Sequence, residues 1–191
     1  MKRRLVIGIS GASGAPIAVE VLRQLRQASV FEVHLIVTGG AEMTLRQETG
    51  MAVSDIRGLA DVFHENSDIG AGPASGSFLT EGMIIVPCSM KTVAGIVSGY
   101  SENLLLRAAD VTLKERRKLV LAARESPLST VHLRNLLELS RMGGMIVPPM
   151  LSYYQHPKTI EDCTEMLARR MLRQFLPEEG FPEWEGMNEN R

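Results

Sequence analysis

Small side chains and hydroxyl groups follow the first apolar run of the chain. Residues 5–9 lead into Ser10 and Ser13, and glycines stand at positions 8, 11 and 14. A strand that passes through such a loop into a helix presents backbone N–H groups to an anion at the helix N-terminus. The spacing G-x-x-G-x-x-G differs from both the dinucleotide fingerprint and the P-loop. It predicts an anion-binding turn, and the alternative is a tight turn that binds nothing.

Two further apolar runs end in residues that could do chemistry. Residues 83–87 lead into Cys88 and Ser89, and residues 119–123 lead into Arg124 and Glu125. Ligands of open α/β sheets bind outside the carboxyl ends of the strands. We therefore expect both ends to face the first loop. The alternatives are an ordinary helix N-cap at Ser89 and a surface ion pair of Arg124 with Glu125.

The run at residues 32–37 ends at Thr38, where a dinucleotide enzyme would carry an acid for the ribose hydroxyls. A neutral hydroxyl suits a phosphate better, which counts against NAD. His34 lies inside this run, and its position favours a buried or sheet-face histidine over a catalytic one.

Strand and helix patterns alternate along the chain and predict one α/β domain, a three-layer parallel sheet with helices on both faces. The predicted strands are residues 5–9, 32–37, 83–87, 119–123 and 144–147. The predicted helices are residues 15–27, 41–49, 53–60, 103–116, 130–142 and 160–175. Residues 63–81 show weak periodicity and predict a long loop, whose small residues favour a site loop over a linker. A polar tail is expected from about residue 177.

Composition excludes several classes of protein. A net charge of −1 over 191 residues argues against a nucleic-acid binder held by phosphate contacts. Two cysteines, Cys88 and Cys163, give neither a disulfide framework nor metal-ligand spacing, so we expect a reducing, cytoplasmic setting and no metal. The absence of a long apolar stretch predicts no signal peptide and no membrane span.

Several unrelated motifs occur in one order along the chain: PASGS, PCSMKT, RAADVTLKERR, RESP and Tyr154-x-x-Pro157. Together they closely resemble the UbiX-type flavin prenyltransferases, also known as the B subunit of hydroxyarylate decarboxylase operons. The resemblance implies a Rossmann/flavodoxin-like fold and a homododecamer with sites where subunits meet. It also implies a metal-independent transfer of a dimethylallyl group from dimethylallyl phosphate to N5 and C6 of reduced FMN. The product, prenylated FMN, serves a separate UbiD-type decarboxylase.

The resemblance also implies a role for individual residues. Those matched to FMN binding are Gly11, Ala12, Ser13, Thr38, Ser89, Met90, Lys91, Thr92 and Arg124. Those matched to dimethylallyl phosphate are Lys114, Arg124, Tyr154, Arg170 and, as a nearby aromatic, Trp184. Those matched to the chemistry are Ser13, Glu48, Ser75 and Glu125. Three positions depart from the family pattern: Thr38 replaces the more usual Ser, Gly39 a common Lys, and Ser126 a common Thr.

The chemistry of these residues agrees with such a transfer. Ionising an allylic phosphate requires cations and hydrogen-bond donors on the departing phosphate, which Lys114, Arg124 and Arg170 could supply with Tyr154. A dry apolar pocket must bring the allyl cation to the flavin before water does. Ring closure at C6 releases a proton, and Glu125 is the expected relay, together with hydroxyls such as Ser13.

Two rival functions stay open at this point. A flavin-dependent cysteine-type decarboxylase needs a catalytic histidine after the third strand, where residues 68–71 stand instead, with His64 four residues early. A non-catalytic flavin-binding subunit of an aromatic acid decarboxylase would have no use for the phosphate-binding cations.

Overall fold

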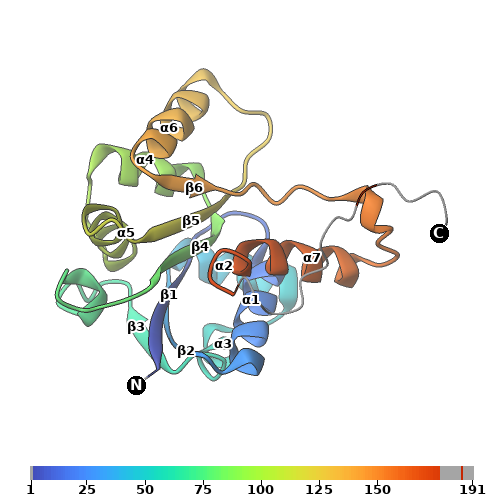
Figure 1. Cartoon of the computed structure of the whole chain (residues 1–191), viewed down its shortest axis with the longest axis horizontal. Helices are drawn as coiled ribbons and strands as arrows, with labels where there is room; N and C mark the ends of the chain where they lie inside the picture. Colours follow the sequence, from blue (N-terminus) through green and yellow to red (C-terminus); the bar gives the residue numbers. More distant parts are fainter. Residues whose placement is uncertain (1, 177–185, 187–191) are drawn as a thin grey trace.

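Six parallel strands form a single sheet in the computed structural model, which describes residues 2–176 and 186 (Figure 1). The strands are β1 (Arg3–Ile9), β2 (Phe31–Val37), β3 (Val62–Glu65), β4 (Gly82–Cys88), β5 (Lys118–Ala123) and β6 (Gly144–Ile146). Their order is β3-β2-β1-β4-β5-β6, and every neighbouring pair is parallel. This is the Rossmann order, which reverses direction between β1 and β4.

Helices cover both faces of the sheet, which confirms the predicted three-layer α/β architecture (Figure 1). One face packs against α1 (Ala15–Ala28), α2 (Gly39–Thr49), α3 (Val53–Arg57) and α7 (Ile160–Leu172). The other face packs against α4 (Met90–Ser98), α5 (Leu104–Lys114) and α6 (Thr130–Arg141). Two short 3-10 helices, η1 (Gly72–Ala74) and η2 (Tyr153–Gln155), lie in the connections.

The central strands alternate between two apolar clusters. In β1, Leu5 and Ile7 face the α1 side of the sheet, and Val6 faces the α5 side. A strand covered on both faces has no solvent side, so its sequence is a continuous apolar run instead of an alternating one. This is why the central strands were recognisable in the sequence.

The predicted loop at residues 63–81 is wrong in its first part. Residues Val62–Glu65 form β3, which pairs with β2 at the edge of the sheet. With only four residues, none fully buried, this strand has no apolar run to reveal it. The neighbouring helix was also predicted too long, since it ends at Arg57 instead of residue 60.

An extended segment leaves the sheet after β6 and carries η2 at its end, before α7 returns to pack against α1 (Figure 1). The predicted tail from about residue 177, with Trp184, lies outside the described residues. The longest helix of the described part, α1, has 14 residues, which is too short to span a bilayer.

Candidate active site

The two predicted strand-to-helix turns lie side by side at the point where the strand order reverses. Ser10, which is 1% exposed, fixes them to each other. Its hydroxyl donates to the Pro87 carbonyl (3.0 Å) and accepts from the Ser89 N–H (2.8 Å). Local sequence patterns did not reveal that Ser10 connects the two turns, because its partner Pro87 lies 77 residues further along the chain. Ligands of this fold bind in the crevice at such a point.

The neighbouring strand ends join the same edge. The Thr38 N–H donates to the Ile9 carbonyl, and the Arg124 N–H donates to the Cys88 carbonyl, both at 3.0 Å. The loop after β1 touches the start of α2, where a Cβ on Gly11 would lie 2.9 Å from the Gly40 backbone. Glycine is therefore required at position 11, and Ser13, Thr38, Ser89 and Arg124 share one edge of the sheet.

The hydroxyls of this edge cap helices. Thr38 Oγ1 accepts from the Ala41 N–H (3.2 Å), and Ser89 Oγ accepts from the Thr92 N–H (3.3 Å). Capping satisfies one of the orphan N–H groups at each helix start and leaves others directed at the crevice. Lys91 is exposed, whereas the Met90 side chain is 7% exposed and belongs to the core, so Met90 offers a ligand only its backbone.

Glu48 occupies the N-terminus of α1. Its Oε2 accepts from the Gly14 N–H (2.9 Å) and the Ala15 N–H (2.8 Å), across from the last turn of α2. Gly14, the N-cap residue, has no side chain that could do this. A carboxylate of the chain itself therefore occupies the N-terminus of α1. The first turn was predicted to bind an anion there, but that anion is Glu48 and not a phosphate.

Arg124 and Glu125 are both exposed at the carboxyl end of β5. Glu125 Oε1 accepts from the Ser126 N–H at 3.0 Å. The ion pair of Arg124 with Glu125, considered as an alternative, does not form among the described residues. Both charged groups are available to a ligand at this edge.

Ser75 and Lys114 lie at the opposite edge of the sheet. Lys114 ends α5 just before β5 begins, and the loop that carries Ser75 runs into β4 through a bond of the Glu81 N–H to the Arg4 carbonyl (2.8 Å). A seven-residue strand such as β4 is about 20 Å long. The structure therefore does not bring Ser75 or Lys114 to Ser13 within one chain.

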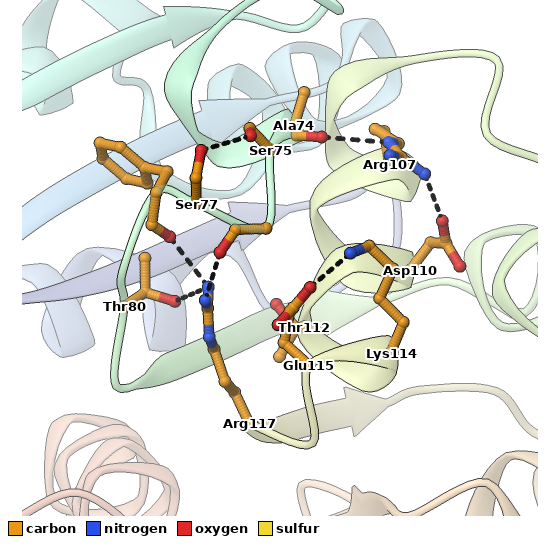
Figure 2. A network of polar contacts seen from close by, with 12 residues as sticks. Ala74, Ser75, Ser77, Thr80, Arg107, Asp110, Thr112, Lys114, Glu115 and Arg117 are labelled. Atoms are coloured by element: carbon orange, nitrogen blue, oxygen red, sulfur yellow. Dashed lines mark hydrogen bonds and ion pairs between the residues drawn. The ribbon is translucent and has the colours of Figure 1, made fainter.

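A polar network surrounds Ser75 and Lys114 (Figure 2). Ser75 Oγ lies 2.9 Å from Ser77 Oγ, and Lys114 Nζ donates to Glu115 Oε1 at 2.5 Å. The Lys114 ammonium holds the pKa of the Glu115 carboxyl below its usual range. Arg107, about two helical turns before Lys114 on α5, donates to the Ala74 carbonyl at 3.1 Å. Sequence reasoning missed Arg107, although it opens the RAADVTLKERR motif.

Tyr154 and Arg170 are exposed on η2 and on α7 respectively. A cleft of about 480 Å³ adjoins Thr38, and another of about 390 Å³ adjoins Lys91. Ser13, Arg124 and Lys114 line neither of these two clefts and are exposed in one protomer. Among the described residues, no group of three or more His, Cys, Asp or Glu could hold a metal ion.

His34 and His64 form a packed pair instead of a catalytic centre. His34 Nδ1 lies 2.9 Å from His64 Nε2, and their rings stack with centroids 5.2 Å apart. Burial lowers the pKa of both imidazoles. His34 is 3% exposed, which confirms its prediction as a buried histidine. His64 is committed to this pair inside β3, which weakens the decarboxylase alternative further.

Comparison with known proteins agrees with this geometry. Residues 1–171 match the Flavoprotein family. The chain is 52% identical over 189 residues to a probable UbiX-like flavin prenyltransferase from Streptomyces sp. (strain D7), covering 98% of this chain and 94% of that protein.

Two solved structures share the fold over almost the whole chain. AnUbiX (PadA1), in complex with FMN and dimethylallyl pyrophosphate, has a TM-score of 0.95 at 46% identity, covering 98% of this chain and 100% of that one. A dodecameric FMN-dependent UbiX-like decarboxylase from Escherichia coli O157:H7 has a TM-score of 0.92 at 48% identity, covering 96% and 100%. From its strand order, its two paired turns and these likenesses, the chain belongs to the UbiX-like flavin prenyltransferase family of flavoproteins.

Proposed function

We propose that the protein is a flavin prenyltransferase that transfers a dimethylallyl group from dimethylallyl phosphate to N5 and C6 of reduced FMN. The observation that carries this proposal is the carboxyl edge of the sheet, where two small-residue turns are bound together through Ser10 beside Arg124. The prenylated FMN serves a UbiD-type decarboxylase. The protein works in the cytoplasm, in keeping with two cysteines that are both free.

The residues of this edge fit FMN by the chemistry of their donors. The exposed Ser13 hydroxyl and the first N–H groups of α2 and α4 are neutral donors next to positive helix ends, which favour a phosphate. Thr38 replaces the family's usual Ser and keeps its capping hydroxyl. Gly39 stands where the family commonly has a lysine, so that position supplies no positive charge. The Arg124 guanidinium supplies a positive charge at this edge instead. FMN, when bound here in its reduced form, provides the nucleophilic nitrogen and ring carbon that accept the allyl group.

Lys114 meets the flavin loops of another subunit, because about 20 Å of sheet separates them within one chain. Many exposed apolar side chains near η2 and α7 are available for subunit contacts, among them Met150 (74% exposed), Tyr153 (77%) and Ile160 (79%). The related E. coli O157:H7 structure is dodecameric. A dodecamer with shared sites follows for this chain, and light scattering that finds an active monomer at dilute concentration would contradict it.

Each charged residue has a distinct task in the transfer. Lys114, Arg124 and Arg170 attract the departing phosphate, and Tyr154 is the hydrogen-bond donor that orients it. Glu125 accepts the proton that leaves the ring carbon. Glu48 has one carboxylate oxygen bound to the α1 amides, and its other oxygen is the second candidate for moving a proton.

The test is direct. Purified protein is incubated anaerobically with reduced FMN and dimethylallyl phosphate, and the flavin is then weighed by mass spectrometry. We expect the flavin to gain one prenyl unit, with no gain when FMN is kept oxidised. A flavin of unchanged mass after prolonged incubation would overturn the proposal.

A further inference from the structure

The loop that carries Ser75 is held by arginine side chains. Arg117 donates from Nη2 to the Gly76 carbonyl (2.7 Å) and from Nη1 to the Phe78 carbonyl (2.9 Å). Arg107 donates from Nε to the Ala74 carbonyl (3.1 Å). Three alternate carbonyls of the loop therefore accept from guanidinium groups. Figure 2 shows Ala74 with Arg107, and Arg117 on the other side of the loop. A segment outside regular secondary structure needs such partners for its backbone polar groups.

The Phe78 side chain anchors the other side of the same loop. A Cβ on Gly72 would lie 2.8 Å from the Phe78 ring, and the Arg4 guanidinium stacks over the ring at 4.5 Å from its centroid. The His34 ring meets Phe78 edge-on with centroids 5.0 Å apart. The loop is thus fixed through one aromatic side chain and through carbonyls bound to arginines.

This arrangement puts Gly76 against the Lys114–Glu115 ion pair. A Cβ on Gly76 would overlap Glu115 Oε1 and lie 2.8 Å from Lys114 Nζ. The Gly76 backbone therefore passes close to the ends of the Lys114 and Glu115 side chains, on the same loop as Ser75 and Ser77.

We propose that Arg117 is a positioning residue, which acts through Gly76 and Phe78 to place Lys114 and Ser75 for the prenyl phosphate. This inference rests on the proposed function. Arg117 itself is half-buried under the loop, with its guanidinium engaged by Gly76 and Phe78, so it holds the loop instead of touching the substrate. A planar guanidinium can serve two carbonyls in fixed directions, whereas a lysine ammonium is a single point charge on a flexible stem.

The test compares Arg117→Lys with the matched control Arg116→Lys, which changes an exposed neighbouring arginine in the same way. We expect Arg117→Lys to raise KM for dimethylallyl phosphate by about 10- to 100-fold, the cost of a misplaced positioning group. FMN affinity should change less than about twofold, because Arg117 acts through Lys114 and Ser75, which are not among the residues that hold FMN. Arg116→Lys should behave as wild type. A loss of folding alone would lower activity and FMN binding together, without this split.

A second measurement does not depend on turnover. Hydrogen exchange on the FMN-loaded protein should show faster exchange of the amides of residues 75–80 in Arg117→Lys, with the amides of residues 10–14 unchanged. If the wild type prenylates FMN and Arg117→Lys keeps both the wild-type KM and wild-type exchange, the positioning role is wrong and the proposed function stands. If the wild type leaves FMN unmodified, the proposed function fails and this inference fails with it.

Discussion

The two edges of the sheet are built in different ways. At the carboxyl edge, helix caps and backbone bonds between adjacent strand ends fix the site, with Ser10 joining the loops after β1 and β4. At the amino edge, the loop that carries Ser75 is held, from the end of η1 onward, by the side chains of Arg107 and Arg117. Both edges depend on contacts between residues distant in the chain, 77 positions apart for Ser10 and Pro87 and about 40 for Arg117 and its partners. They differ in the groups that make the contacts: helix caps and backbone bonds at the first edge, and arginine side chains at the second.

This difference separates the expected effects of substitutions. Changes at the carboxyl edge should alter FMN binding or proton transfer, because that edge holds the flavin. Changes at the amino edge should alter the use of dimethylallyl phosphate and leave FMN binding intact. The substitutions Ser13→Asp, Glu125→Gln and Gly76→Ala test that separation, in decreasing order of expected effect.

Ser13→Asp should abolish FMN binding. It places a carboxylate at an exposed position of the first flavin loop, where it would repel the flavin phosphate or be buried without a partner. An uncompensated buried charge costs about 3–5 kcal/mol, which corresponds to a loss of at least about 100-fold in affinity. A fluorescence titration with FMN measures it, and Ser140→Asp, on the exposed end of α6, is the control. Unaltered retention of flavin would place FMN elsewhere.

Glu125→Gln should bind FMN and dimethylallyl phosphate normally and turn over about 10²- to 10⁴-fold more slowly, since it keeps the shape of the side chain and loses its basicity. Gln can still accept from the Ser126 N–H, so the local backbone is preserved. Single-turnover kinetics measure the rate, with Glu138→Gln, an exposed acid paired to Arg141, as the control. If Glu125→Gln turned over at the wild-type rate, Glu125 would not be the proton acceptor, and Glu48 or the departed phosphate would take that role.

Gly76→Ala should raise KM for dimethylallyl phosphate by about tenfold, because the added methyl group displaces the Lys114 and Glu115 side-chain ends. FMN affinity should stay unchanged. Gly58→Ala is the matched control, since a Cβ there meets nothing within 4 Å and its φ of −69° suits alanine. A change in FMN affinity in Gly76→Ala would break the separation of the two edges.

The smallest effect concerns stability and pH. Burial lowers the pKa of His34 and His64 in the folded chain, against the raising influence of Glu32 and Asp68 respectively. Below the ordinary histidine pKa of about 6.5, the unfolded chain then binds more protons than the folded one. The free energy of unfolding should therefore fall as the pH drops from about 6.5 through the lowered pKa values.

Thermal unfolding midpoints between about pH 8 and pH 5 measure this dependence. His64→Asn should flatten the curve, and the exposed His156→Asn should not, because asparagine also tolerates the left-handed backbone at that position. Equal slopes in both variants would show that the histidine pair does not set the pH dependence.

Local sequence patterns were enough to predict the α/β architecture and the turns that form the carboxyl edge. Buried parallel strands are continuous apolar runs, and the turns that follow them need small residues and capping hydroxyls, so Ser13, Thr38 and Ser89 were found from local patterns. The short edge strand β3 was not predicted, because its four residues are not fully buried and include the polar His64 and Glu65.

Which side chains are available to a ligand, and which ones contact each other, became clear only from the tertiary structure. Only the folded chain shows that Glu48 fills the α1 N-terminus, that Met90 points into the core, and that Lys114 lies across the sheet from Ser13. These facts depend on contacts between residues distant in the chain, whereas periodicity and spacing record only the local environment of each residue. The role of Arg117 belongs to the same class, because its partners become its neighbours only when β4 and β5 pair.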